Sequence, residues 1–464
     1  MPGAFYLATL GCPKNEVDSS KLRGRLLAQG YAEASSSDDA DLVVVNTCAF
    51  IEAAREESVE TILELSAARK PGAKLAVTGC LAERYGEELA EAMPEIDVVA
   101  GFGEEVSPER SQGAPQYRSS AAAAPVRLVS RAEIPSFDLL ELPRPRQESP
   151  FAYVKVAEGC DRRCGFCAIP SFRGRQRSRH IDSVLDEVDS LRVSEVVLVA
   201  QDLASYGHDR SRRSPLEAPP GGVPGIVELL EAVAARVHRV RLLYVYPSSL
   251  SDRLIDAIAA TSVPYFDLSL QHASKPLLRA MRRPGSRERF MERIERIRHA
   301  APGAALRSSF ILGYPGETEA DHDELLSFLG EAQLDWGGFF TFSLEEGTLA
   351  ASLPLQVPEE LALERLLECS ELQETITARR RVELVGSDVE VLVDEPGMAR
   401  SYREAPAIDG VVRVPSFVPA GEILTVRVLD AEGPDLIAEP WSVGAGGTKA
   451  AGAPAFASTG QAVT

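Results

Sequence analysis

The chain has 464 residues, of which 45% are hydrophobic and 25% are charged. This length and composition are ordinary for a soluble protein of two or three domains, and they exclude a fibrous or mainly disordered chain. The net charge of −20 indicates an acidic surface, which repels phosphate backbones and attracts basic partners, although plain solubility explains the charge equally well.

The apolar runs and the cysteines indicate the cellular compartment of the protein. No basic region followed by an apolar stretch opens the chain, and no apolar run reaches the roughly 18 residues of a membrane span. We therefore expect a cytoplasmic protein without a membrane partner. Seven cysteines, an odd number scattered over a long chain, favour metal ligation over a disulfide framework.

Residues 1–103 read as repeating strand–helix units. Strand-like runs at residues 5–10, 42–45 and 75–77 lead to Cys12, Cys48 and Cys80, here called the amino-terminal trio. Apolar residues at helical spacing lie between and after them, over 17–29, 53–69 and 81–92. Because parallel strands with right-handed crossovers end at one edge of a sheet, we expect an open parallel α/β domain in which the three cysteines meet.

A single cysteine in such a position is more often a small buried apolar residue than a ligand. Three in the same structural position are hard to obtain by chance. The amino-terminal trio therefore predicts a metal cluster with three protein ligands, leaving one iron that can carry an exogenous sulfur.

Residues 104–145 lose this alternation and are rich in Ser, Pro, Ala and Gln. Neither a helical nor a strand period survives in this stretch. We expect a linker, or a loop laid over the next domain.

A second set of cysteines, Cys160, Cys164 and Cys167, follows the strand-like run at residues 151–156. We call it the loop trio. A 4Fe-4S cluster takes four thiolates, so three leave one iron free, as is needed to bind S-adenosylmethionine (SAM) and reduce it to a radical. Zinc is the alternative, but zinc sites usually add a second pair of Cys or His nearby, and none follows here. The spacing also resembles the radical SAM superfamily signature.

Strand–helix alternation continues through residues 146–382. Strands are expected at 151–156, 195–200, 240–246, 265–270, 306–312 and 337–342. Helices are expected at 181–192, 226–237, 252–260, 287–299, 319–332 and 359–382. Six repeats suit an incomplete barrel, whose chemistry lies at the carboxyl ends of the strands.

Polar or glycine-rich residues follow several of these strands. We propose that they contact the polar parts of SAM, with simple turn chemistry as the alternative. The residues are Gln201, Asp202, Gln271, Gly313 and Glu317. His272 reads as a structural histidine rather than a proton shuttle, Phe166 as a residue packed at the cluster, and Cys369 as a buried residue without a metal role.

Residues 383–442 change to short alternating runs, at 389–393, 411–414 and 423–429, which predict a small antiparallel barrel. Over residues 384–441 there are 11 acidic and 4 basic residues, a net charge of −7. A nucleic-acid-binding face normally has the opposite sign. Residues 443–464 are rich in Gly, Ala, Ser and Thr, and we expect a disordered tail.

With both trios in place, residues 4–441 resemble the methylthiotransferases of the radical SAM superfamily. The motifs Leu10-Gly-Cys-Pro-Lys-Asn15, Asn46-Thr-Cys-Ala-Phe-Ile51, Thr78-Gly-Cys-Leu81, Lys155-Val-Ala-Glu-Gly-Cys160, Ile169-Pro-Ser-Phe-Arg-Gly174 and Ala405-Pro-Ala-Ile-Asp-Gly410 carry the resemblance. It implies an amino-terminal cluster domain, a radical SAM core and a carboxyl-terminal TRAM barrel.

The branch of that family that modifies a ribosomal protein is the more similar one. The tRNA-modifying branch typically has Gln-Met where this chain has Pro13-Lys14, and it usually has a more basic barrel. The resemblance implies transfer of a methylthio group to the β-carbon of an aspartate in small-subunit ribosomal protein twelve, a basic protein near the decoding centre. The alternative is the same chemistry on a tRNA adenosine.

The resemblance also implies two 4Fe-4S clusters, SAM, an external electron donor and a sulfide source. We hypothesise that the loop trio serves formation of the radical and that the amino-terminal trio serves sulfur transfer. A non-catalytic iron–sulfur carrier would explain two clusters and the acidic surface. It would not need six strand–helix repeats or an open iron.

Overall fold

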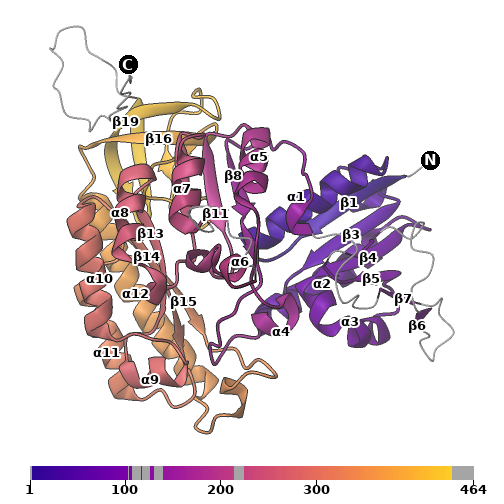
Figure 1. Ribbon diagram of the computed structural model, residues 1–464, viewed down its shortest axis with the longest axis horizontal. Helices are drawn as coiled ribbons and strands as arrows, with labels where there is room; N and C mark the ends of the chain where they lie inside the picture. The colour runs from indigo at the N-terminus through magenta and orange to yellow at the C-terminus, as the bar shows by residue number, and fades with distance from the viewer. Residues whose placement is uncertain are drawn as a thin grey trace.

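The computed structural model describes residues 3–102, 104–106, 116–117, 126–129, 139–213 and 224–440. The expected disordered tail, 443–464, lies outside these residues, as does most of the expected linker. Along the chain the structure comprises an α/β domain, an open barrel and a small closed barrel (Figure 1). No helix among the described residues is long and apolar enough to cross a membrane.

The first sheet has the order β2-β1-β3-β4-β5-β7-β6, and all its neighbouring strands are parallel except β6 and β7. Its strands are β1 (Ala4–Thr9), β2 (Ala32–Glu33), β3 (Leu42–Thr47), β4 (Lys74–Gly79), β5 (Val98–Ala100), β6 (Gln116–Tyr117) and β7 (Val126–Val129). Helices α1 (Pro13–Ala28), α2 (Glu52–Ala68) and α3 (Cys80–Ala92) connect the strands. The predicted open α/β sheet is confirmed, but β2, β5, β6 and β7 lie where the sequence predicts no strand.

Alternate side chains of the central strands pack on opposite faces of this sheet. Val43 and Val45 of β3 join the core on one face, whereas Val44 joins the core on the other. Every residue of β3 is buried. This explains its nearly continuous apolar run, since a parallel strand covered on both faces needs apolar residues at every position.

The open barrel has six parallel strands in two sheets, β8-β11-β12 and β13-β14-β15, joined by an isolated bridge between Val245 and Leu268. The strands are β8 (Phe151–Lys155), β11 (Glu195–Val199), β12 (Arg239–Leu242), β13 (Tyr265–Gln271), β14 (Ala305–Leu312) and β15 (Trp336–Thr341). The main helices are α5 (Ile181–Leu191), α7 (Ile226–Ala234), α8 (Asp252–Thr261), α10 (Arg287–Ala300), α11 (Glu319–Ala332) and α12 (Glu359–Val382). The predicted incomplete six-fold barrel is confirmed.

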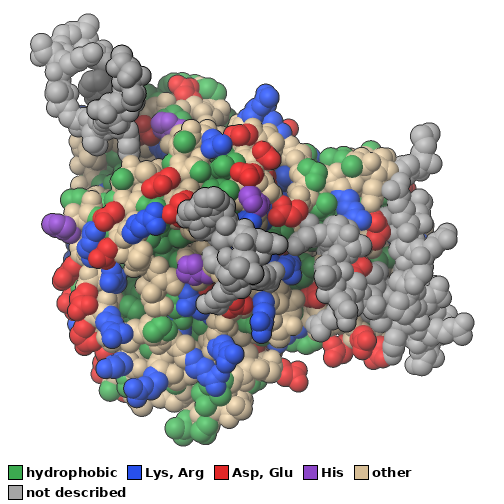
Figure 2. All heavy atoms as spheres, viewed as in Figure 1, with side chains coloured by type: hydrophobic (Ala, Val, Ile, Leu, Met, Phe, Trp, Pro, Cys, Tyr) green, Lys and Arg blue, Asp and Glu red, His purple; other side chains and the backbone are tan. Residues whose placement is uncertain are grey.

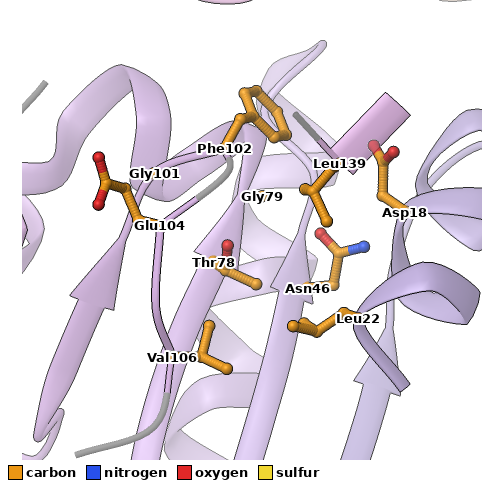
Figure 3. A pocket seen from close by; sticks show the side chains of 10 residues that line it. All are labelled: Asp18, Leu22, Asn46, Thr78, Gly79, Gly101, Phe102, Glu104, Val106 and Leu139. Atoms are coloured by element: carbon orange, nitrogen blue, oxygen red, sulfur yellow. The ribbon is translucent and has the colours of Figure 1, made fainter. Parts of the chain in front are cut away.

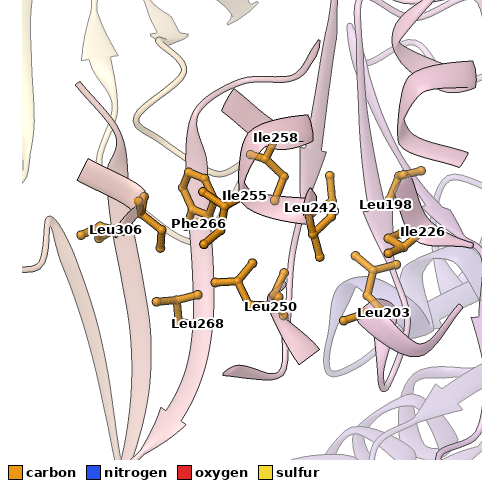
Figure 4. Packing of buried hydrophobic residues seen from close by; sticks show 14 of the residues in the cluster. Leu198, Leu203, Ile226, Leu242, Leu250, Ile255, Ile258, Phe266, Leu268 and Leu306 are labelled. Atoms are coloured by element: carbon orange, nitrogen blue, oxygen red, sulfur yellow. The ribbon is translucent and has the colours of Figure 1, made fainter. Parts of the chain in front are cut away.

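The main core lies between the barrel strands and these helices. Leu198 and Leu242 of the strands pack with Ile255 and Ile258 of α8, and each is at most 1% exposed (Figure 4). Cys369 of α12 belongs to the same core and is fully buried, as predicted.

Helix α1 of the first domain packs against the barrel. Its Val17 is fully buried in one apolar cluster with Tyr153 of β8, Val197 of β11 and Trp336 of β15. The amino-terminal end of α1, where Cys12 lies, is therefore held beside the strands that carry the loop trio.

The last domain is a closed five-stranded barrel of order β16-β17-β18-β20-β19. Its strands are β16 (Asp388–Glu395), β17 (Met398–Arg400), β18 (Val412–Arg413), β19 (Ile423–Glu432) and β20 (Asp435–Pro440). Pairing is antiparallel except between β18 and β20. The predicted barrel is confirmed, although the alternating pattern identified only three of its strands.

Short elements complete the fold. They are β9 (Ala157–Glu158), β10 (Arg177–Ser178), α4 (Ile169–Arg173), α6 (His208–Arg213), α9 (Lys275–Ala280) and 3-10 turns at Ser37–Asp39, Leu139–Glu141, Leu203–Ser205, Pro247–Ser249 and Ala350–Ser352. The loop trio lies between β9 and α4, after the first barrel strand.

Candidate active site

The amino-terminal trio lies at the carboxyl ends of three neighbouring strands. Cys12 precedes α1, Cys48 follows β3, and Cys80 begins α3 directly after β4. Gly11 has φ +92°, and a Cβ at this position would lie 2.9 Å from Cys48 Sγ. Only glycine therefore lets the turn after β1 approach the Cys48 thiol so closely.

The three thiols of this trio influence one another. Burial and the neighbouring Cys80 and Cys12 thiols raise the pKa of Cys48 to about 11. Burial also raises the pKa of Cys80, against the opposing charge of Arg173. At Cys12 burial acts in the same direction, but the charges of Lys14 and Arg173 and two backbone hydrogen bonds outweigh it, so the pKa is lowered.

The loop trio is anchored by backbone hydrogen bonds on both sides of Gly165. Its N–H donates to the Met281 carbonyl across 2.8 Å, and its carbonyl accepts from the Ala350 N–H across 2.8 Å. Phe166 packs in the same apolar cluster as Met281 and Ala350. The loop therefore holds its cysteines against the α9 end of the barrel.

Burial and a neighbouring thiol make deprotonation of Cys160 and Cys167 unfavourable without a counter-charge. Burial raises the pKa of Cys160 to about 11, with Asp202 and the Cys164 thiol adding to the shift, and burial raises the pKa of Cys167 to about 12, with the Cys164 and Cys160 thiols adding to it. Thiolates in such a site need a metal or a cation nearby.

Cations lie beside these thiols. Arg283 Nη1 donates to Cys164 Sγ across 3.5 Å, and its guanidinium lies 4.1 Å from the centre of the Tyr246 ring. Arg162 lies 4.1 Å from the same ring and pairs with Asp202 across 2.6 Å. The two arginines thus place positive charge beside the loop where thiolate ligands would carry negative charge.

A buried group of charges connects the two trios. Arg173 of α4 donates to Cys80 Sγ across 3.1 Å, to Asn15 Oδ1 across 2.7 Å and to Glu158 across 3.0 Å. Lys155 binds Glu158 across 2.6 Å and also pairs with Asp18. We call Lys155, Asp18, Glu158 and Arg173 the bridging charges.

Sequence reasoning missed the bridging charges as functional residues. Lys155 and Glu158 fall inside the motif that ends at Cys160, and Arg173 falls inside the motif from Ile169 to Gly174, whereas Asp18 lies three residues after the first motif. The available signal was a charged residue in a stretch expected to be buried, since charged residues are almost never fully buried unless paired.

Three of the predicted SAM contacts have a buried acceptor oxygen without a hydrogen bond, and that of Glu317 lies 3.5 Å from Arg365 Nη1. Gln201 donates to Glu158 across 2.8 Å, but its Oε1 is buried without a hydrogen-bond partner. Asp202 is 2% exposed, and its Oδ1 is likewise buried without a partner. Because buried polar atoms are normally satisfied, these two oxygens fit a polar ligand beside the loop trio.

The other predicted contacts have structural roles of their own. Glu317 accepts hydrogen bonds from the N–H groups of Gly313 and Tyr314 and so closes its own turn. Gly313 packs on α12, where a Cβ would lie 2.5 Å from Ala362 Cβ. Gln271 ends β13 in a left-handed conformation, φ 75°.

His272 follows Gln271 and is fully buried. Its Nδ1 accepts a hydrogen bond from Ser274 N across 3.0 Å, and burial lowers its pKa to about 3. A histidine that stays neutral and is bonded to its own turn matches the structural role predicted for it.

Each trio supplies three cysteine thiols, and a guanidinium group donates to one sulfur of each, Arg173 to Cys80 and Arg283 to Cys164, which is donor chemistry that suits iron–sulfur clusters. The thiols are not gathered around a point for a single ion: within the described residues, no three His, Cys, Asp or Glu side chains are arranged to hold a metal ion. A small cavity in the amino-terminal domain is lined by Asp18, Asn46, Thr78 and Phe102, among others (Figure 3).

Three family models match the chain. The model of the uncharacterised protein family UPF0004 matches residues 4–101, the radical SAM superfamily model residues 154–329, and the TRAM domain model residues 385–440. The matches cover the first sheet except β6 and β7, most of the open barrel, and the closed barrel.

Curated relatives match over almost the whole chain. The ribosomal protein uS12 methylthiotransferase RimO of Moorella thermoacetica is 43% identical, covering 90% of this chain and 95% of that protein. RimO of Streptomyces coelicolor is 39% identical, covering 95% of this chain and 98% of its own. RimO of Myxococcus xanthus is 39% identical, covering 94% of this chain and 91% of that protein.

A matching solved structure is more distant in sequence than these relatives. The radical SAM methyltransferase TsrM from Kitasatospora setae, with tryptophan substrate and a SAM analogue bound, has 15% identity and a TM-score of 0.47, covering 74% of this chain and 73% of that one. The family assignment rests on the curated relatives instead. The chain belongs to the RimO family of radical SAM methylthiotransferases.

Proposed function

We propose that this protein transfers a methylthio group to the β-carbon of an aspartate in ribosomal protein uS12. The observation that carries the proposal is the bridging of two cysteine trios by one buried group of charges. Arg173 contacts Cys80 of one trio, and its partner Glu158 lies two residues before Cys160 of the other. A protein with a single task, radical formation or sulfur storage, would not need both trios linked in this way.

We assign a 4Fe-4S cluster to each trio, with Cys12, Cys48 and Cys80 as ligands of one and Cys160, Cys164 and Cys167 as ligands of the other. When bound, the clusters and SAM would supply a radical able to remove hydrogen from an unactivated carbon and the methylated sulfur that replaces it. Supply of electrons and of sulfide from outside the chain is part of the proposal.

Residues of the chain would bind and orient the cofactor. The free oxygens of Asp202 and Gln201 are acceptors for the ammonium or hydroxyl groups of SAM. Arg162 donates a hydrogen bond to Ser249 Oγ across 2.6 Å and pairs with Asp202. It therefore fixes the Asp202 carboxylate in place. Gln271, Gly313 and Glu317 remain candidates, with Glu317 acting through its turn.

The surface charge of the closed barrel favours a basic protein over RNA. Its two exposed arginines are already paired, Arg413 with Glu432 across 2.8 Å and Arg427 with Asp388. Glu395, Glu422 and Glu439 of the closed barrel are exposed carboxylates that form no ion pair with any described residue. Elsewhere acidic and basic side chains are mixed, as on the face in Figure 2. A basic partner gains steering from such a barrel, whereas a phosphate backbone is repelled.

The domain division that accompanies this proposal is residues 1–103 for the amino-terminal cluster, 146–382 for the radical SAM core and 383–442 for the TRAM barrel. Residues 104–145 connect the first two. In this division the bridging charges lie on both sides of the boundary, with Asp18 on one side and Lys155, Glu158 and Arg173 on the other.

The test is an anaerobic reaction of the reconstituted protein with SAM, reductant and sulfide. Isolated uS12 and unmodified tRNA are offered in parallel, and both are analysed by mass spectrometry. We expect a methylthio group on the uS12 aspartate and none on tRNA. Modification of tRNA alone would refute the protein substrate, and absence of SAM cleavage would refute the radical chemistry.

A further inference from the structure

Lys14 places a positive charge beside the amino-terminal trio. It lies in the first turn of α1, two residues after Cys12, and its side chain is half-buried. Its Nζ lies 3.5 Å from the centre of the Tyr244 ring, which follows barrel strand β12. The side chain thus spans from the first domain to the barrel wall, and part of it remains open to solvent.

The tyrosine under this lysine is held in an unusual backbone conformation. Tyr244 has φ 64° although it is not glycine, and its N–H donates to Asp267 Oδ2 across 2.9 Å. A bulky residue in the left-handed region is strained, and such strain persists only where the surroundings enforce it. The structure therefore fixes the aromatic face on which the ammonium rests.

In the part of the chain that the structure describes, no carboxylate forms an ion pair with Lys14. The two carboxylates with the strongest influence on it, Asp267 and Glu158, are bound by other cations. Asp267 pairs with Arg307 across 3.0 Å, and Glu158 pairs with Lys155 and Arg173. Among the described residues, the ammonium of Lys14 forms neither an ion pair nor a hydrogen bond.

A half-buried ammonium without a carboxylate is incompletely solvated and incompletely paired. Contact with an aromatic face compensates only in part. An entering carboxylate would supply the missing partner through a charge-assisted hydrogen bond. Lys14 lies where such a group would also be next to Cys12.

We propose that Lys14 binds the side-chain carboxylate of the substrate aspartate and so determines that the protein accepts aspartate. This inference rests on the proposed function. The ion pair would hold the β-carbon, one bond from the carboxylate, beside the trio assigned to sulfur transfer. Asparagine has the same shape but no charge, so discrimination between the two measures the contribution of Lys14.

The experiment measures binding of the reconstituted full chain to uS12 and to uS12 with the target aspartate replaced by asparagine, by fluorescence anisotropy under anaerobic conditions. We expect the wild-type protein to bind the aspartate form about tenfold tighter or more, the value of one charge-assisted hydrogen bond. In Lys14→Gln the preference should vanish, and in Lys14→Arg most of it should remain. The matched control is Lys275→Gln, an exposed lysine of α9, which should keep the wild-type preference.

The outcomes separate this inference from the proposed function. If the wild-type protein neither binds nor modifies uS12, the proposed function fails and the role of Lys14 fails with it. If it modifies uS12 while Lys14→Gln keeps the preference for aspartate, only the role of Lys14 is refuted. Iron analysis is the second readout: loss of iron from Lys14→Gln would assign the residue to cluster retention and would also overturn the inference.

Discussion

Arg173 and Cys80 lie on opposite sides of the boundary between the first domain and the barrel, and Arg173 Nη2 donates to Cys80 Sγ across 3.1 Å. The arginine is 6% exposed and is fixed at its other end by Glu158. A guanidinium held in this way favours the thiolate form of Cys80, which is the form that ligates metal. The contact therefore ties the cysteine chemistry of one domain to the cofactor loop of the other.

Replacing Arg173 should weaken the cluster held by the amino-terminal trio. In Arg173→Met the thiolate of Cys80 loses its cation while its burial is unchanged, so we expect lower iron and sulfide content after reconstitution. Arg175→Met is the matched control because Arg175 lies two residues further on and is exposed. Equal iron content in the two variants would show that the contact does not support the cluster.

Substitutions in the two trios should affect two different parts of the reaction. Cys48→Ala should lose about four irons per chain and should still cleave SAM under reducing conditions without adding sulfur to uS12. Cys164→Ala should lose SAM cleavage altogether. Cys369→Ala removes a thiol that is fully buried in the main core, and it should retain the full iron content. Sulfur insertion by Cys48→Ala would refute the proposed division of labour.

The sequence was sufficient for the architecture because hydrophobic periodicity and the positions of the cysteines follow simple rules. Helices α11 and α12 begin and end where the apolar spacing predicts, at Glu319–Ala332 and Glu359–Val382. Eight of the described strands were missed: β2, β5, β6, β7, β9, β10, β17 and β20. They have six residues or fewer, too short to show a clear period.

The electrostatic part of the site could not be predicted from the sequence. Lys155 and Asp18 are 137 positions apart in the chain, and periodicity does not reveal which charged residue will pair with which other. Gly313 and Glu317 were expected at the cofactor because they follow a strand. The structure shows that Gly313 also provides space for α12 and that Glu317 closes its own turn, which the sequence pattern alone does not distinguish from ligand binding.

The bridging charges should contribute strongly to stability. Lys155 is fully buried, so Lys155→Met leaves Asp18 and Glu158 to share Arg173. Removing one partner of a buried ion pair costs about 3–5 kcal/mol, and urea denaturation should show a loss of this size. The control is Arg23→Met, since Arg23 and Glu33 form an ion pair with side chains 39% and 37% exposed, and such pairs contribute about 0–1 kcal/mol. A loss for Lys155→Met no larger than for Arg23→Met would contradict the structural role of the pair.

His272 should make the free energy of unfolding depend on pH. Burial lowers its pKa to about 3, below the ordinary value of about 6.5, so between these values the unfolded chain binds the additional proton. Stability is then complete above pH 6.5 and falls as the pH drops, by about 2 kcal/mol at pH 5. In cluster-free His272→Gln this part of the pH dependence should be absent, whereas His180→Gln, at a side chain 57% exposed, should keep it. Parallel pH profiles for the wild type and His272→Gln would contradict the prediction.

The acidic surface of the closed barrel should affect the capture of uS12 rather than the chemical step. A variant with Glu395→Lys, Glu422→Lys and Glu439→Lys reverses exposed charges that form no ion pair within the described residues. We expect the KM for uS12 to rise severalfold at low ionic strength with kcat unchanged, because rim charges act mainly on encounter. The difference should shrink near 1 M salt, where the screening length is about 3 Å.

The control for the barrel variant carries the same change in net charge on the outer side of the core, as Glu292→Lys, Glu295→Lys and Asp323→Lys on α10 and α11. If docking is local to the barrel, this variant should keep a KM close to that of the wild type. An equal rise in both variants would mean that only the overall charge of −20 attracts the substrate. A KM unaffected by either variant would mean that uS12 is recognised away from the barrel, at the surface around the two cysteine trios.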